Sequence, residues 1–384
     1  MRKVAVIGIG MTKFGQLWKR DLTSLSVEAG VNAVRDAGIH QKDVEVLYGG
    51  TMSGGLFINQ EHLGSMLPDY MGFKNIPSVR VEAACASGGL ALRQAYIDIA
   101  SGMHDIAVVG GVEKMTDIGT YSITKALATA ADTVNESNFG ATFPGLYALM
   151  AKLHMHKYKT TEEQLASVAV KNHLNALDNP NAQFHKKISI QDVMDSAKIA
   201  DPLKLLDASP ITDGAAAIVL ASEKKAKKLS DTPVWIKGSG HATDTISLHD
   251  RDDLLTLSAT VSAAKQAYLQ ARLQPKNIDM AEVHDCFTIA ELLAIEDLGF
   301  VKKGKSGKFT EEGYTKIGGK IPINPSGGLK AKGHPIGASG VAQAIEAVLQ
   351  LRGDAGKRST NSENALTHNV GGSGGTSVVH IFER

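Results

Sequence analysis

Apolar residues along this chain fall into short runs that are separated by helical patterns. The first run, at 4–10, has the length and the branched apolar content of a buried strand. A helical pattern with small residues on one face follows it, and a second apolar run comes at 44–48. Because strand, helix and strand alternate in this order, the pattern predicts βαβ units and a mixed α/β fold.

The same order of elements occurs a second time in the carboxyl-terminal part of the chain. Residues 234–240 read VWIKGSG and resemble VAVIGIG at 4–10 in alternation and glycine placement, and a run at 278–283 corresponds to 44–48. The helical patterns in between share small residues at matching places: Ser24, Ala29, Ala33 and Ala37 in one half, and Ser258, Ala263, Ala267 and Ala271 in the other. We therefore predict two pseudo-symmetric halves that pack as a pair of mixed sheets with helices between and outside them.

Two helical segments, at 86–101 and 341–351, are apolar on nearly every side. Helices of this kind are covered on all faces, so we expect them in the middle layer of the fold. Matching Ala-Ser-Gly sequences stand at their heads, at 86–88 and 338–340. If the halves are related by a pseudo-twofold axis, the amino-terminal ends of these two helices can meet across it.

Residues from about 112 to 205 have no counterpart in the second half. They contain a clear helix, for which Thr160 and Glu163 predict a capping box ahead of Leu165. We interpret this region as an inserted helical lobe over the site. The expected organisation is a first half at 1–111 and 206–230, an inserted lobe at 112–205, and a second half at 231–384.

Composition narrows the function classes. Among the 384 residues, 41 basic and 40 acidic side chains leave a net charge of +1, so no global field favours nucleic acid or an anionic membrane. No apolar run approaches the roughly 20 residues that span a bilayer, and the chain begins directly as a strand. Two cysteines give no disulfide framework and suit a reducing compartment. We expect a cytoplasmic protein without nucleic-acid or membrane partners.

Both cysteines stand at places suited to chemistry. Cys85 lies in EAACASGG at 82–89, where a β-rich stretch gives way to the apolar helix. The unpaired N–H groups and partial positive charge of a helix amino terminus favour a thiolate there, and the N–H of Cys85 could help bind an oxyanion. His334 precedes the corresponding helix of the second half, so the repeat predicts that it faces Cys85 as the base that a nucleophilic thiol needs. Taken alone, each residue also fits an inert core cysteine or a turn histidine.

A second group of candidates follows a strand of the second half. His284 and Cys286 stand at the carboxyl edge where α/β sheets bind ligands, and a thiol there could act as an acid and base. The glycine-rich loop at 368–375 could direct backbone N–H groups at an oxyanion. Cys85, His284, Cys286 and His334 could in principle bind zinc, but without C-x-x-C spacing we expect no metal. The chain also lacks the motifs of a dinucleotide fingerprint and of a P-loop.

Together these motifs resemble the thiolase family from one end of the chain to the other. The resemblance rests on the Cys85 motif, on ASPITDGAAA at 208–217, on GHPIGASG at 333–340 and on the terminal glycine-rich loop. It implies a five-layer αβαβα sandwich of two similar halves with a loop domain inserted in the first, in agreement with the repeat. It also implies a homodimer or a homotetramer.

Two departures from the family pattern indicate a branch. Most thiolases carry Asn-Glu-Ala-Phe where this chain has HDCF at 284–287, and a second cysteine where it has His368 and Asn369. Sterol-carrier-protein-type thiolases, and a similar archaeal and bacterial group, make this exchange. By that resemblance Cys286 takes the place of the usual second cysteine, although a different loop carries it. The roles of His368 and Asn369 stay open.

The resemblance implies an acetyl-CoA C-acetyltransferase, which joins two acetyl-CoA molecules into acetoacetyl-CoA and CoA, or performs the reverse thiolysis. Cys85, assisted by His334, would carry the acyl group, whose oxygen rests on the N–H groups of Cys85 and Gly371. Cys286 would remove the α-proton of the second acetyl-CoA, and His334 and His284 would stabilise the enolate. This mechanism implies an intermediate in which the acyl group is bound to the sulfur of Cys85.

The resemblance also places the CoA substrate. The pantetheine arm is expected along Ala208 and Ser209, and the nucleotide against the inserted lobe. CoA thioesters are then substrates, and no cofactor is bound permanently.

Other interpretations stay open. The chain could be a 3-ketoacyl-CoA thiolase for longer acyl chains, or a non-catalytic subunit that binds lipid or a partner on a thiolase fold. A decarboxylating ketosynthase fits less well because it would leave Cys286 without a role. Archaeal thiolases similar to this chain are found in complexes with hydroxymethylglutaryl-CoA synthase and a small OB-fold protein. That likeness suggests such partners and a place in the isoprenoid (mevalonate) pathway.

Overall fold

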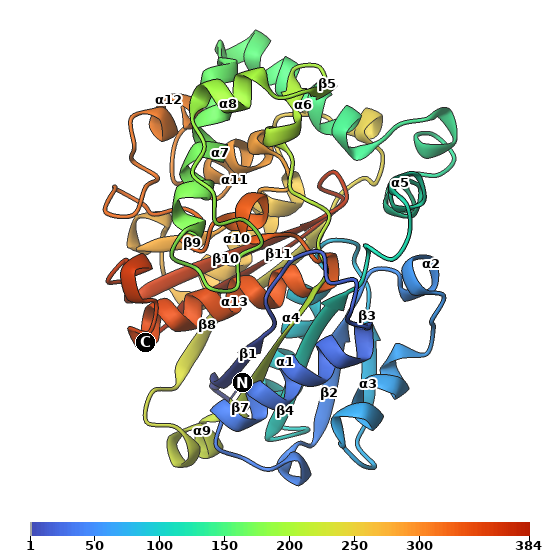
Figure 1. Ribbon diagram of the computed structural model, residues 1–384. Coiled ribbons are helices and arrows are strands. Elements are labelled where there is room, and N and C mark those ends of the chain that lie inside the picture. The colour runs from blue at the N-terminus through green and yellow to red at the C-terminus, as the bar shows by residue number, and fades with distance from the viewer. Residues whose placement is uncertain (1) are drawn as a thin grey trace.

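The computed structural model describes residues 2–384 (Figure 1). Its first half contains β1 (Val4–Met11), α1 (Leu22–Asp36), β2 (Val46–Gly50), α2 (Gly54–Ile58), α3 (Leu63–Met71), β3 (Ser78–Val81), α4 (Ser87–Ser101), β4 (Ile106–Glu113), β7 (Gly214–Ser222) and α9 (Glu223–Leu229). The strands of this half are ordered β3-β2-β4-β7-β1. Strands β2, β3 and β4 run parallel, and β7 is antiparallel to both β4 and β1.

The second half repeats this arrangement. It contains β8 (Val234–Thr243), α10 (Ser258–Ala271), β9 (Met280–Glu282), α11 (Thr288–Asp297), α12 (Ser306–Glu311), a π-helix (Gly328–Lys332), α13 (Ile336–Arg352), β10 (Asn364–Gly371) and β11 (Thr376–Glu383). Its strand order β9-β10-β11-β8 matches β2-β4-β7-β1, and an isolated bridge from Ala281 to Ile323 stands where β3 pairs with β2. The prediction of two pseudo-symmetric halves is confirmed.

The two sheets are joined, although a pair of separate sheets was expected. Strands β1 and β8 pair at Ala5 with Trp235 and at Val6 with Val234, which makes one hydrogen-bonded sheet of nine strands. These are equivalent edge strands of the two halves. Their pairing satisfies backbone groups that would otherwise lie unpaired at two exposed edges.

Five layers follow from the alternation of side chains along the strands. Val4 and Val6 of β1 face the central helices α4 and α13, while Ala5 and Ile7 face α1 on the outside. In the second half α10 covers the outer face of β8 and β11 (Figure 1). The predicted αβαβα arrangement is therefore confirmed.

The repeated glycines and alanines of the sequence have one steric cause. A Cβ on Gly10 would collide with the carbonyl oxygen of Ala29 in α1, and a Cβ on Gly240 would collide with that of Ala263 in α10. Each outer helix therefore lies directly on its strand, which leaves room only for small residues at the contact. The same close packing in both halves explains why the repeat is visible in the sequence.

The central helices differ at their heads. Helix α4 begins at Ser87, close to the predicted position, whereas α13 begins at Ile336, ahead of the predicted start at 341. The buried carboxylate of Glu113 accepts a hydrogen bond from the N–H of Gly337 at 3.0 Å. This contact stabilises an additional first turn of α13.

The inserted segment is largely helical. It contains α5 (Thr120–Ala128), α6 (Phe143–Tyr158), α7 (Glu162–Ala176), α8 (Ile190–Asp195) and the short strands β5 (Lys198–Ala200) and β6 (Leu203–Lys204). The predicted capping box was wrong by one residue, because Thr161 and Gln164 cap α7. The hydroxyl of Thr160 is instead paired with Nδ1 of buried His154 at 2.8 Å. None of the helices in residues 2–384 combines the length and the apolar character needed to cross a membrane.

Candidate active site

Cys85 lies in a tight turn between β3 and α4. Ala84, immediately before it, has a φ of +49°, a backbone conformation that non-glycine residues rarely adopt. The hydroxyl of Ser87 holds this turn, since it accepts from the N–H of Ala83 at 2.9 Å and donates to the carbonyl of Ala84 at 2.6 Å. The turn exposes Cys85 to an internal cavity of about 190 Å³.

Three of the four predicted catalytic residues line this cavity, and His284 lies beside them without lining it. Cys85, Cys286 and His334 line it. A ring nitrogen of His284, a ring nitrogen of His334 and the sulfur of Cys85 lie within 4.8 Å of one another. The two imidazole rings are nearly perpendicular, with 5.1 Å between their centres. Residues from both halves of the sheet thus converge on one point.

His334 is held in one tautomer. The hydroxyl of Ser339 donates to the carbonyl of Pro335 at 2.9 Å, so its oxygen accepts from Nδ1–H of His334 at 2.7 Å. Nε2 of His334 is then the unprotonated nitrogen. Burial lowers the pKa of this histidine to about 3, which keeps the ring neutral. A neutral imidazole with a free Nε2 can accept a proton from a neighbouring thiol.

Both thiols are protonated at rest, which corrects the expectation that Cys85 is a thiolate. The pKa of Cys85 is raised to about 12, chiefly by burial; the N–H of Gly372 lowers this pKa, and the Glu113 carboxylate raises it by a smaller amount. Burial, with Cys85 next to it, also raises the pKa of Cys286. Helix α4 begins two residues beyond Cys85, at Ser87, and its positive end does not offset the loss of water.

We predict that neither thiol ionises in the neutral range. Since the pKa of Cys85 lies at about 12 and that of Cys286 is also raised, ultraviolet thiolate absorbance should stay flat from about pH 5 to pH 9. Titrations of Cys85→Ala and Cys286→Ala assign any change to one thiol. A step with a midpoint below about pH 8 that disappears in Cys85→Ala would contradict the protonated resting state.

The predicted oxyanion and CoA residues lie beside the thiols. The backbone N–H of Gly372 contacts the sulfur of Cys85, while its neighbour Gly371, predicted to bind the oxyanion, is the last residue of β10. Ala208 and Ser209 line the same cavity. The N–H of Ser209 donates to the carbonyl of Cys286 at 2.9 Å, which fixes the predicted pantetheine segment against the second thiol.

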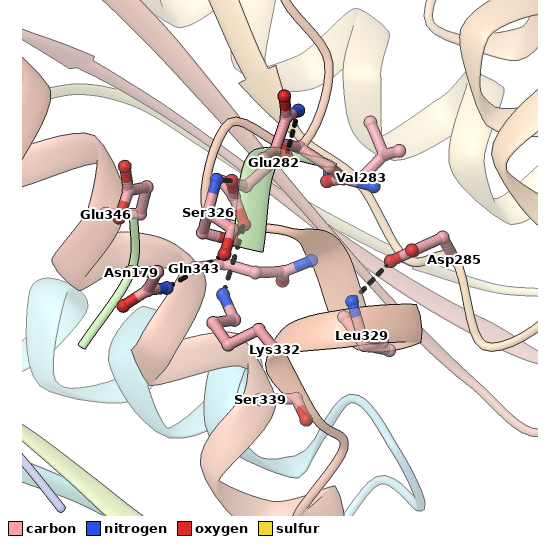
Figure 2. A network of polar contacts seen from close by, with 12 residues as sticks. Asn179, Glu282, Val283, Asp285, Ser326, Leu329, Lys332, Ser339, Gln343 and Glu346 are labelled. Carbon is pink, nitrogen blue, oxygen red and sulfur yellow. Dashed lines mark hydrogen bonds and ion pairs between the residues drawn. The ribbon is translucent and has the colours of Figure 1, made fainter. Parts of the chain in front are cut away.

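Buried charged residues connect the loop after β9 to the loop before α13 (Figure 2). Glu282, at the end of β9, accepts from the hydroxyl of Ser326 at 2.6 Å and pairs with Lys332 at 3.2 Å. Asp285 does not line the cavity, and its carboxylate accepts a hydrogen bond from the backbone N–H of Leu329 at 2.6 Å. Because β9 leads to His284 and Cys286, and Lys332 precedes His334, these contacts set the spacing between the two loops.

The two residues with open roles, His368 and Asn369, are adjacent on β10 but do different things. Nε2 of buried His368 is paired with the hydroxyl of Thr260 at 2.9 Å, outside the cavity. The side-chain amide of Asn369 contacts the carbonyl of Cys85 at 3.0 Å and Nδ1 of His284 at 3.2 Å. His368 therefore connects β10 to Thr260 of α10, and Asn369 connects Cys85 to the loop that carries His284.

Two family profiles match most of the chain. The profile described as "Thiolase, N-terminal domain" matches residues 4–224, and the profile described as "Thiolase C-terminal domain-like" matches residues 240–384. The chain belongs to the thiolase family. The resemblance predicted from the sequence motifs is confirmed.

Relatives of this thiolase include both groups that the HDCF motif indicated. An acetyl-CoA acetyltransferase of Methanothermobacter thermautotrophicus is 55% identical over 385 residues, which are 100% of each chain. Sterol carrier protein 2 of Bos taurus is 37% identical over 99% of this chain and 72% of its own length. A solved chain described as "Ltp2-ChsH2(DUF35) aldolase" has a TM-score of 0.87 at 26% identity and covers 99% of this thiolase and 97% of itself. The predicted branch is confirmed.

Sequence reasoning missed two residues of the thiolase site. Tyr147, on α6 of the inserted segment, lines the cavity together with Cys286 and donates to the carbonyl of Gly372 at 3.1 Å. Glu113 is buried at the end of β4 and binds the first turn of α13. Neither belongs to a motif, and a buried tyrosine or glutamate gives no local signal of its partner far along the chain.

This thiolase site also brings together atoms that could bind a metal. The set found among residues 2–384 is Cys85, His284 and His334, with no carboxylate among them. A cysteine binds a metal as a thiolate, whereas burial raises the pKa of the Cys85 thiol and favours its protonated form. The absence of a metal cofactor stays a prediction.

Proposed function

We propose that this thiolase catalyses the Claisen condensation of two acetyl-CoA molecules to acetoacetyl-CoA and CoA, and the reverse thiolysis. The observation that carries the proposal is the convergence of Cys85, Cys286 and His334 on one cavity, with a ring nitrogen of His284 within 4.8 Å of the Cys85 sulfur and of a His334 ring nitrogen. The full-length relative named acetyl-CoA acetyltransferase supports this choice of substrate.

In the first stage Cys85 attacks the thioester carbon of acetyl-CoA. Nε2 of His334 takes the thiol proton as the carbon–sulfur bond forms. The developing oxyanion is met by the N–H of Cys85 and by that of Gly371 in the adjoining glycine loop. As the bond to the CoA sulfur breaks, Cys286 gives its proton to the leaving group. CoA departs as a thiol, and Cys286 is left as a thiolate.

In the second stage this thiolate removes an α-proton from another acetyl-CoA. The enolate oxygen is then stabilised by His284 and by His334, which still holds the proton of Cys85. The enolate carbon attacks the acetyl group on Cys85, and collapse of the adduct releases acetoacetyl-CoA. Cys85 recovers its proton from His334, and Cys286 retains the α-proton. Both thiols are thereby returned to their resting state.

The proposed substrate path follows the cavity. The pantetheine arm lies along Ala208 and Ser209, and the nucleotide lies against the lobe formed by residues 112–205. Phe143 and Tyr147 of α6 line the cavity together with Ser209, which supports this path. CoA thioesters act as substrates, and no permanent cofactor takes part.

We predict that the purified protein, given acetoacetyl-CoA and free CoA, releases two acetyl-CoA molecules per turnover. Loss of the acetoacetyl-CoA enolate absorbance measures the rate, and a series of longer 3-ketoacyl-CoA substrates measures chain-length preference. A higher kcat/KM for long chains would favour the alternative 3-ketoacyl-CoA thiolase. Turnover of malonyl-CoA without acetyl-CoA condensation would indicate a decarboxylating ketosynthase and contradict the proposal.

Assembly is a further part of the proposal. The solved relative whose description includes a DUF35 component supports a search for a small protein partner. We predict a complex with hydroxymethylglutaryl-CoA synthase and an OB-fold protein, and a homodimer or homotetramer of this chain. A cytoplasmic location and a role in isoprenoid synthesis also stay predictions. Co-purification from the native source tests the complex.

A further inference from the structure

Asn369 occupies the point where the two central helices cross. A Cβ on Gly89 of α4 would meet the side-chain amide oxygen of Asn369 at 2.9 Å, and a Cβ on Gly340 of α13 would overlap the same oxygen. Both helices therefore carry a glycine where the amide lies. Asn369 itself is 2% exposed. A buried side-chain amide is stable only if its N–H groups and its oxygen form hydrogen bonds.

The partners fix which way the amide points. Its oxygen accepts a hydrogen bond from the backbone N–H of Gly89 at 3.1 Å, and an N–H group can only donate. Its nitrogen faces the carbonyl oxygen of Cys85 at 3.0 Å, which can only accept. Exchange of the amide oxygen and nitrogen would break both contacts, so the orientation is unambiguous.

The remaining amide hydrogen determines the tautomer of His284. The nitrogen of Asn369 lies 3.2 Å from Nδ1 of His284 and has only a hydrogen to offer. Nδ1 must therefore be the acceptor, and the ring proton must lie on Nε2. Nε2 of His284 is buried and has no hydrogen-bond partner among residues 2–384. It belongs to a ring that has one nitrogen within 4.8 Å of the Cys85 sulfur and of a His334 ring nitrogen.

We propose that Asn369 is a positioning residue that locks His284 as the Nε2–H tautomer and so makes it a permanent hydrogen-bond donor to the substrate oxygen. The part about substrate rests on the proposed function. Burial, with His334 and His368 nearby, holds the pKa of His284 well below its usual range, so the ring stays neutral and keeps this single proton.

The Nε2 atoms of the two histidines therefore have opposite hydrogen-bonding roles. Ser339 leaves Nε2 of His334 as an acceptor for the Cys85 proton, while Asn369 leaves Nε2 of His284 as a donor. Two acceptors would repel an enolate oxygen, and two donors would leave Cys85 without a base. Once the Cys85 proton has moved to His334, both rings donate, which is the arrangement that an enolate requires.

The test combines a spectroscopic and a kinetic readout. Nitrogen NMR of protein with ¹⁵N-labelled histidine rings distinguishes the two tautomers, and the His284→Asn variant assigns the signals. We expect wild-type His284 to be protonated at Nε2. In Asn369→Asp the carboxylate accepts both the N–H of Gly89 and the Nδ1–H of His284, so the proton should move to Nδ1.

The kcat for condensation should depend on the tautomer of His284. In Asn369→Asp we expect kcat for condensation to fall by about 10²–10³-fold, the loss typical of one oxyanion donor, with much less change in KM. In the His284→Asn background, where no tautomer exists, the same substitution should cost less than about tenfold. Gln343→Glu is the matched control, because Gln343 is also a buried amide that donates to a carbonyl, that of His368 at 3.0 Å, outside the cavity.

Two results would overturn the proposal. One is a wild-type His284 that carries its proton on Nδ1, which NMR detects without any variant at residue 369. The other is an equal kinetic loss from Asn369→Asp in both backgrounds, which would indicate a purely structural role. The NMR readout needs no turnover, so an Nε2–H signal in a protein that fails to condense acetyl-CoA would reject the proposed function and leave the tautomer lock standing.

Discussion

Replacement of Cys85 by alanine should abolish both condensation and thiolysis, with a loss in kcat on the order of 10⁴-fold or more, because every step passes through the acyl group on its sulfur. Cys286→Ala should act differently. The variant keeps Cys85, His334 and the N–H groups around the acyl oxygen, so it should still release CoA in a first-turnover burst from acetyl-CoA, although more slowly because the CoA sulfur leaves without the Cys286 proton. Loss of the second thiol as acid and base should lower kcat for condensation by about 10²–10⁴-fold.

Stopped-flow measurement of the CoA burst, alongside steady-state condensation, separates these two effects. Ser26→Ala serves as a control, since Ser26 is buried on α1 outside the cavity and its hydroxyl donates to the carbonyl of Leu22 at 2.8 Å. If Cys85→Ala and Cys286→Ala lose the burst equally, the thiols do not divide the work, and the proposed sequence of proton transfers is wrong.

Lys332→Met should lower the free energy of unfolding by about 3–5 kcal/mol, the range for a buried charge that loses its partner. Lys332 is 2% exposed and Glu282 is fully buried, so the substitution leaves the Glu282 carboxylate without water or a counter-ion. Urea unfolding, followed by circular dichroism, measures the change. The double variant Glu282→Gln, Lys332→Met should recover part of the loss because the orphaned charge is gone.

An exposed ion pair provides the comparison for this substitution. Lys227 pairs with Glu223 at 2.7 Å on the surface of α9, and Lys227→Met should change the free energy of unfolding by less than about 1 kcal/mol. If Lys332→Met costs no more than Lys227→Met, the buried pair does not hold the catalytic loops in place. If the double variant is less stable than Lys332→Met, the stranded charge is not the cause.

The sequence predicted those parts of the fold that are repeated. Gly10 and Gly240 are forced by the same close packing of a helix on a strand, and this constraint appears at matching positions in both halves. The repeat then placed Cys85 and His334 opposite one another, because each stands at the head of an equivalent central helix. The pairing of β1 with β8 could not be predicted, since it depends on how the two halves meet rather than on either one.

The protonation of the site was predicted less well. A helix amino terminus indicated a thiolate at Cys85, but the pKa of a thiol depends on its burial and on Glu113 as well, which is close only in the folded chain. Asn369 was recognised as a departure from the thiolase pattern without a role. The role that we propose for it depends on three contacts, to Gly89, Cys85 and His284, which only the folded chain brings together.

The most direct test of the central claim is to identify the acylated residue. Wild-type protein mixed with acetyl-CoA is quenched in acid and digested, and the peptides that contain Cys85 and Cys286 are compared by mass spectrometry. We expect one acetyl group on Cys85 and an unmodified Cys286. An acetyl group on Cys286, or on neither cysteine while acetoacetyl-CoA is formed, would contradict it.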